Sequence, residues 1–198
     1  MQMKDVRNIQ YEMASIVNKN AFQIYASDEW LDISSMWHLV LRIGEMRDEQ
    51  KRMYSSTKNW SKHSTHSLGV AGEVAFYLHT GLHLNYETIL SGDGSVDFIY
   101  SDKTIDIKST QYWKDPELKQ YMKPKYWCDY YVLVSVDFDG KKAKVCGHIK
   151  SETLKNASIK NFGHGDQRSV NHTELEKGLP SFLPKNSLMS FIRSIVSE

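Results

Sequence analysis

The sequence predicts an α/β domain in which a mixed sheet is flanked by helices. One helix-type stretch is followed by three short β-type runs, and a polar connection then leads to two longer β-type runs. This order, αβββ(α)β, is typical of a sheet domain and not of a helical bundle. Hydrophobic residues make up 40% of the 198 residues and charged residues 25%, which favours a folded chain with a sizeable core.

The first helix-type stretch covers residues 64–80. Ser64 or Thr65 can cap its beginning, and Gly81 is placed to end it. The β-type runs are expected at 87–90, 96–100 and 104–109, with a Ser-Gly-Asp-Gly turn between the first two, and at 130–138 and 143–149, joined by an Asp139-Gly140 turn. A short helix at 151–155, a long loop over 156–180 and a final helix at 188–196 complete the prediction.

Three segments are expected along the chain. Residues 1–63 carry apolar residues at helical spacing and are interpreted as a helical N-terminal extension, with Asp28 as a helix cap. Residues 64–150 form the core, and residues 151–198 form a C-terminal loop and helix that pack on it. We expect a cytoplasmic protein without membrane contact, because no apolar run approaches 18 residues and no signal-peptide pattern begins the chain. The two cysteines are interpreted as reduced core residues.

The β-type run that ends in Ile105-Asp106-Ile107-Lys108 carries the most informative chemistry. Side chains alternate between the two faces of a strand, so Asp106 and Lys108 share one face. If Ser101 and Asp102 form a two-residue hairpin loop, Asp97 on the preceding strand lies opposite Asp106, with Cβ atoms roughly 5 Å apart.

Two carboxylates that face each other across a hairpin repel and destabilise the sheet. A divalent cation resolves that conflict, because oxygen ligands at this separation suit Mg²⁺. Lys108 could then orient an attacking water or neutralise charge on a phosphate. The alternative is that Asp97 and Asp106 are solvated on an open sheet face and that Lys108 is their surface ion-pair partner.

The helix-type stretch carries one acid, Glu73, among small and apolar residues. Gly69 and Gly72 each cost a helix about 1 kcal/mol relative to alanine, which suggests that another part of the chain approaches closely. Glu73 is therefore either a partly buried functional carboxylate or a lone surface charge.

Together these motifs resemble the PD-(D/E)XK, or restriction-endonuclease-like, nuclease superfamily. The resemblance covers residues 64–150 and consists of Gly72-Glu73, the run from Gly92 to Asp97, and Asp106-Ile107-Lys108. Val96 replaces the proline of the superfamily's name. The resemblance implies an αβββαβ core, Mg²⁺ or Mn²⁺ as cofactor, Asp97, Asp106 and the Ile107 carbonyl as metal ligands, Glu73 as a ligand directly or through water, and Lys108 acting on the nucleophilic water.

Basic and aromatic residues follow the predicted catalytic strand and could meet nucleic acid. The second half of the chain is the more basic one, since residues 101–198 carry 16 Lys and Arg against 12 Asp and Glu. Lysines neutralise phosphates, and aromatic rings stack on splayed bases. The alternative is an amphipathic connector and a solvated face. The candidate nucleic-acid-binding residues are Tyr112, Lys114, Lys119, Lys123 and Lys125, with Lys58 and Lys62 on a second basic stretch.

The sequence therefore predicts a Mg²⁺-dependent nuclease, an endonuclease that hydrolyses phosphodiester bonds in DNA. Two alternatives stay open. One is a resolvase of Holliday junctions, which would need a homodimer to cut two strands. The other is a nucleic-acid-binding or assembly subunit that has the same fold but does not cut.

Overall fold

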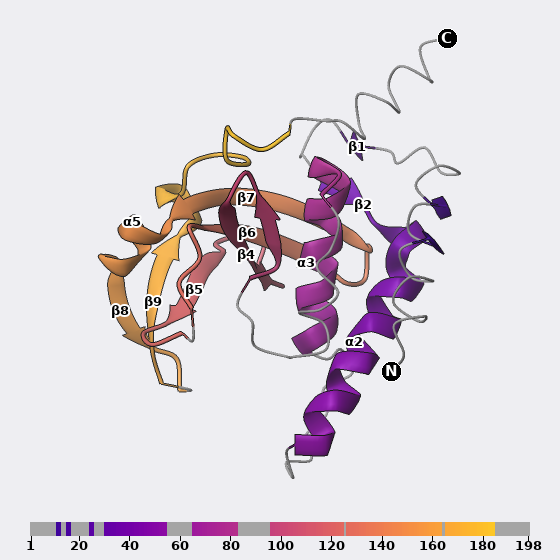
Figure 1. Cartoon of the computed structure of the whole chain (residues 1–198), viewed down its shortest axis with the longest axis horizontal. Helices are drawn as coiled ribbons and strands as arrows, with labels where there is room; N and C mark the ends of the chain where they lie inside the picture. Colours follow the sequence, from indigo (N-terminus) through magenta and orange to yellow (C-terminus); the bar gives the residue numbers. More distant parts are fainter. Residues whose placement is uncertain are drawn as a thin grey trace.

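The fold is a mixed α/β arrangement with a curled mixed sheet, seen in a computed structural model of the chain (Figure 1). The structure describes residues 11–12, 15–16, 24–25, 30–54, 65–82, 96–124, 126–163 and 165–184. Within them, the larger sheet has six strands in the order β1-β2-β7-β6-β4-β3. These strands are β1 (Ile24–Tyr25), β2 (Trp30–Asp32), β3 (Phe98–Tyr100), β4 (Lys103–Thr110), β6 (Tyr130–Asp137) and β7 (Lys142–Lys150).

Strand β4 carries Asp106 and Lys108 and pairs with two strands that run in opposite directions. It is antiparallel to β3 through a tight turn and parallel to β6, which in turn is antiparallel to β7. A parallel neighbour requires a long connection between the two strands, and residues 111–129 supply it. The predicted strands at 96–100, 104–109, 130–138 and 143–149 are confirmed to within a few residues.

A second, three-stranded sheet with the order β5-β9-β8 was not predicted. Its strands are β5 (Glu117–Tyr121), β8 (Ser158–Asn161) and β9 (Asp166–Asn171). The prediction of a long loop over 156–180 is therefore wrong, and the connection between β4 and β6 holds a strand instead of a helix. The reason is visible in β8, whose four residues are all exposed and carry no apolar alternation that could reveal a strand.

Helices α2 (Trp37–Tyr54) and α3 (Thr65–Thr80) lie to one side of the larger sheet, and the smaller sheet lies to the other (Figure 1). The predicted helix at 64–80 is confirmed, and it ends as expected at Gly81, whose φ is 71° and whose N–H donates to Tyr77 O at 2.7 Å. Gly72 lets α3 approach β4, because a Cβ there would collide with Ser109 and lie 3.3 Å from Ile107 Cγ2. The expected close approach at this glycine is confirmed.

The alternation of side chains along the central strands gives the larger sheet a core on each face. Ile105, Ile107 and Val132 pack with the helices. Tyr131 and Leu133, on the opposite face of β6, pack with Leu118 of β5 and with the short helix α5 (Ser151–Lys155). The predicted helix at 151–155 is thus confirmed, and it closes the second core through Leu154.

The stretch interpreted as a helical extension also contributes to the sheet. Strand β2 pairs with β7, and a 3₁₀ turn, η1 (Ser34–Met36), leads from it into α2. A three-residue strand is too short to show alternation in the sequence, which is why it was missed. The predicted strand at 87–90, the helix at 188–196 and the Asp28 cap lie outside the described residues. No helix among the described segments is long and apolar enough to span a membrane.

Candidate functional site on the β3–β4 hairpin

The β3–β4 hairpin has the register that the sequence predicts. Tyr100 pairs with Lys103 and Phe98 with Ile105, so the loop consists of Ser101 and Asp102 alone. Their φ angles of 48° and 59° are those of a tight hairpin turn in which both central residues adopt positive φ. This closure brings Asp97, the residue before β3, beside the middle of β4.

Asp97 lies just before β3, where the hydrogen-bond ladder shifts. Its backbone N–H donates to Ile105 O at 2.9 Å, and its carboxylate Oδ2 accepts from the backbone N–H of Ile107 at 2.7 Å. Asp97 is half-buried. The carboxylate is thereby fixed against β4, one residue from Asp106.

Asp106 and Lys108 share a face of β4, as the strand alternation predicts. Asp106 is 4% exposed, and its Oδ2 lies 2.7 Å from Lys108 Nζ. That oxygen is shielded from solvent yet receives no hydrogen bond of ordinary geometry. The ammonium of Lys108 also lies 6.0 Å from the ring centroid of Tyr131 on the neighbouring strand. A buried carboxylate with such sparse hydrogen bonding has capacity for a further cationic ligand.

Glu73 is buried and paired with a residue that the sequence prediction missed. Arg47, on α2, contacts both of its carboxylate oxygens, with Nη1–Oε1 at 2.7 Å and Nη2–Oε2 at 2.8 Å. The reading of Glu73 as a lone surface charge is therefore wrong. Arg47 precedes Glu73 by 26 residues along the chain. The sequence shows it only as one of the basic residues on the helix before α3.

The three carboxylates influence one another, which places them in one cluster. Removal from solvent raises the pKa of Asp97 well above its usual value, and the charges of Glu73 and Asp106 raise it further. Burial likewise raises the pKa of Asp106, although Lys108 opposes that shift. Burial works against the charge on Lys108, but Asp106 still raises the pKa of its ammonium. The site therefore combines two aspartic acids, Asp97 and Asp106, that resist ionisation with a firmly charged lysine.

Cys128 lies close enough to this cluster for the charges of Asp106 and Asp97 to shift its pKa. The thiol is buried, and burial together with the charges of Asp106 and Asp97 raises its pKa to about 12. Its backbone N–H donates to the hydroxyl of Tyr131 at 3.1 Å. Cys128 is therefore a neutral thiol at the wall of the site, in keeping with the interpretation of reduced cysteines.

An open cleft of about 1060 Å³ begins at Lys108. It runs between the start of α3, the end of β4 and the segment that leads into β5, and Tyr112 and Lys119 line it. Lys119 Nζ lies 3.7 Å from the ring centroid of Phe162. The structure thus brings two of the predicted nucleic-acid-binding residues to the cleft of Lys108. Lys114 lies over the ring of the exposed Trp113, Lys123 is exposed, and Lys58, Lys62 and Lys125 lie outside the described residues.

The carboxylates of the cluster contact protein cations and donors, and Asp97 also lies within reach of Asp106. Within the part of the chain that the structure describes, no group of three or more His, Cys, Asp and Glu side chains could hold a metal ion as it stands. Each carboxylate already has a partner within the protein. Glu73 pairs with Arg47, and Asp106 pairs with Lys108. Asp97 accepts a hydrogen bond from the Ile107 N–H. Lys108 occupies Oδ2 of Asp106, so a cation at that oxygen would have to displace the ammonium.

Comparison with known proteins gives no relative. No protein-family model, curated protein or solved structure matches the chain.

Proposed function

We propose that this chain is a divalent-metal-dependent nuclease with a restriction-endonuclease-like core, and that it hydrolyses phosphodiester bonds in DNA. One observation carries the proposal. Asp97, Asp106 and Lys108 meet on a single hairpin, and Lys108 also lines an open cleft. The PD-(D/E)XK superfamily that the sequence resembles places its catalytic residues on such a hairpin.

The electrostatics of the hairpin support a cation site. Burial is the main reason that the pKa of Asp97 is raised, and repulsion by Glu73 and Asp106 raises it further. Mutual repulsion of this kind destabilises a fold unless a cation offsets it. Asp97, Asp106 and the Ile107 carbonyl would hold Mg²⁺ or Mn²⁺ at the hairpin, with Glu73 contributing directly or through a water.

Each residue has a distinct part in the proposed reaction. The bound cation would polarise the phosphate and lower the pKa of a water molecule. Lys108, released from Asp106 when that carboxylate takes the cation, can neutralise charge on a phosphate oxygen or orient the attacking water. Arg47 holds the Glu73 carboxylate in place through two contacts, so it acts as a positioning residue.

The strand connectivity agrees with the proposed core at the hairpin and departs from it in the connection between β4 and β6, which holds β5 in place of the expected helix. Helix α3 precedes the hairpin, and β4 then runs parallel to β6, which is the next strand of the same sheet. The cleft residues Tyr112 and Lys119 fit a nucleic acid, because an exposed ring can stack on a base and a lysine can contact a phosphate.

A second candidate is a nucleic-acid-binding subunit that does not cut. The ion pair between Asp106 and Lys108 favours it, because this pair neutralises the carboxylate without a metal. The two candidates differ in one property that is simple to measure: only the nuclease breaks phosphodiester bonds.

The test is an incubation of the full chain with supercoiled plasmid, linear duplex, single-stranded DNA, RNA and a four-way junction, each with Mg²⁺ or Mn²⁺. We expect nicked or shortened DNA that EDTA prevents. Paired cuts confined to the four-way junction would identify a resolvase. Binding of DNA without cleavage under every metal condition would reject the nuclease and leave the binding subunit.

A further inference from the structure

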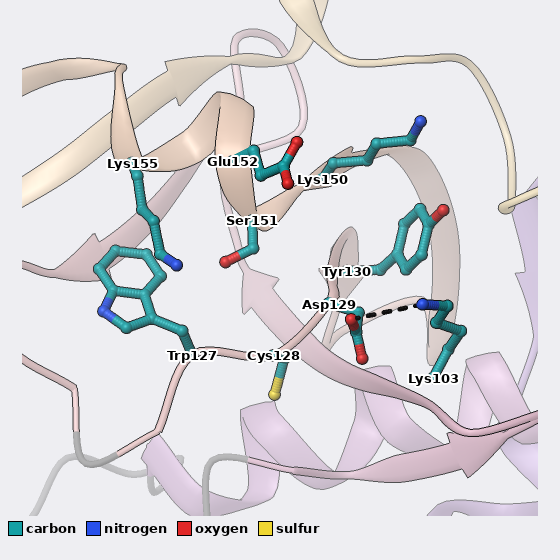
Figure 2. A pocket seen from close by; sticks show the side chains of 9 residues that line it. All are labelled: Lys103, Trp127, Cys128, Asp129, Tyr130, Lys150, Ser151, Glu152 and Lys155. Carbon is teal, nitrogen blue, oxygen red and sulfur yellow. Dashed lines mark ion pairs between the residues drawn. The ribbon is translucent and has the colours of Figure 1, made fainter.

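A second cavity, of about 370 Å³, lies at the opposite end of β4 from the cleft (Figure 2). Its walls come from the start of β4, the segment that leads into β6 and the short helix α5. It shares no lining residue with the cleft of Lys108.

The hydroxyl of Ser151 is the most unusual group in this cavity. Ser151 is only 9% exposed, and its Oγ is buried without a hydrogen-bond partner among the described residues. In Figure 2 the hydroxyl points into the cavity, toward the side on which the Lys155 ammonium lies. Buried hydroxyls are almost always hydrogen-bonded, so an unpartnered one aimed into a cavity indicates a missing polar ligand.

The charge of the cavity wall selects an anion. Three lysines, Lys103, Lys150 and Lys155, line it together with two carboxylates, those of Asp129 and Glu152. The Asp129 carboxylate accepts from both the backbone N–H and the hydroxyl of Thr104 at 2.9 Å through Oδ2, and its Oδ1 lies 3.8 Å from Lys103 Nζ. Lys103 and Asp129 therefore offset each other, and Lys150 and Lys155 against Glu152 leave the wall with one net positive charge.

Trp127 holds the Lys155 ammonium at the wall. The Lys155 Nζ lies 5.1 Å from the centroid of the Trp127 ring, an attraction between a cation and an aromatic face. The ring itself is set edge-on against the buried Tyr131, with centroids 6.2 Å apart and planes at 80°. A lysine positioned in this way loses little freedom when an anion binds.

We propose that this cavity binds the phosphate monoester group of a small soluble ligand, with Lys155 and the Ser151 hydroxyl donating to its oxygens. Phosphate has several strong acceptor oxygens, which matches an ammonium and a hydroxyl that need acceptors. A nucleoside monophosphate carries this group and offers a base that can contact Trp127. The inference does not depend on nuclease activity, because Lys155, Ser151 and Trp127 lie outside the hairpin cluster.

The test is calorimetric titration of the full chain with inorganic phosphate, with AMP and with adenosine, all at one ionic strength. We expect phosphate and AMP to bind saturably and adenosine not to bind. Lys155→Met should weaken phosphate binding about tenfold or more, the loss expected for one charge-assisted hydrogen bond. Lys177→Met, which removes an exposed lysine outside the cavity, is the matched control and should bind as wild type does.

Ser151→Ala separates binding from folding. Because the Ser151 hydroxyl has no hydrogen-bond partner among the described residues, this change should not lower the melting temperature without phosphate. It should reduce the rise in melting temperature that phosphate produces in the wild type. The proposal is overturned if the wild type shows no saturable phosphate binding, if adenosine binds as tightly as AMP, or if Lys155→Met and Ser151→Ala both bind phosphate as wild type does.

Discussion

Arg47 and Glu73 form an ion pair with two contacts that joins α2 to α3 at the proposed active site. Their side chains are 16% and 9% exposed, and both pairs of atoms are within 2.8 Å. The charge of Asp97 adds to that of Glu73 in raising the pKa of Arg47, against the effect of burial. The guanidinium of Arg47 therefore offsets the negative charges of two carboxylates, Glu73 on α3 and Asp97 just before β3.

Arg47→Met should destabilise the protein by about 3 kcal/mol, because it leaves the Glu73 carboxylate buried without its cation. The free energy of unfolding from urea denaturation measures this loss. Arg42→Met is the matched control on the same helix. Arg42 pairs with Glu12 at 3.5 Å, and both side chains are well exposed, so its loss should cost about 0–1 kcal/mol. Equal losses for the two variants would contradict the structural importance of the Arg47 pair.

Asp97→Asn should raise the stability of the metal-free protein at neutral pH. The folded pKa of Asp97 lies well above the usual 3.8, so above pH 3.8 the folded chain binds more protons than the unfolded chain. The contribution of Asp97 to stability therefore falls as pH rises from 3.8 through its folded pKa, and it stays low above that point. The asparagine keeps an oxygen that can accept from the Ile107 N–H.

Thermal melts in EDTA at a series of pH values test this expectation. The melting temperature of Asp97→Asn should exceed that of the wild type at neutral pH, and the difference should shrink as the pH approaches 3.8. Added Mn²⁺ should stabilise the wild type more than the variant. A variant that is less stable than the wild type at every pH would show that the carboxylate is not under electrostatic strain.

The two glycines of α3 should respond in opposite ways to alanine. Gly72→Ala should cost about 1–3 kcal/mol, because its Cβ would meet Ser109 and Ile107 of β4. Gly69→Ala should gain about 0.5–1 kcal/mol, because its Cβ would come no closer than 3.9 Å to Glu73 Oε1 and alanine favours the helix. Ser109→Ala in the Gly72→Ala background should restore part of the loss. Urea denaturation measures all three, and a stabilising Gly72→Ala would refute the close approach.

Lys108 and Lys119 line one cleft but should differ in function. Lys108→Met should lower the single-turnover cleavage rate at saturating DNA and change DNA affinity in Ca²⁺ little, because it removes an interaction that is strongest in the transition state. Lys119→Met should weaken affinity, flatten the slope of log K against log salt by roughly 0.9 for duplex DNA, and leave the saturated rate unchanged. If Lys108→Met loses only affinity, its role is that of a phosphate contact.

The local parts of the fold could be predicted from the sequence. The end of α3 follows from Gly81, and the hairpin register follows from side-chain alternation with the shortest possible loop. Both depend on residues that are close together along the chain. The position of Asp106 and Lys108 on one strand face was predictable for the same reason.

The parts that depend on distant pairing could not be predicted. Strand β8 is held by β9 and has no apolar face of its own, so its sequence resembles a loop. The partner of Glu73 was missed because nothing in the sequence distinguishes Arg47 from the other basic residues of α2. The cavity at Ser151 was missed because Trp127, Ser151 and Lys103 come from three separate segments.

Single-turnover cleavage of a labelled DNA duplex in Mn²⁺ by wild type and Asp106→Asn tests the central claim most directly. Asp139→Asn, in the exposed turn after β6, is the control for loss of one carboxylate. We predict metal-dependent cleavage by wild type and Asp139→Asn, and none by Asp106→Asn at equal melting temperature, because the variant loses a metal ligand. Cleavage by Asp106→Asn at the wild-type rate would contradict the assignment of the β3–β4 hairpin as the active site.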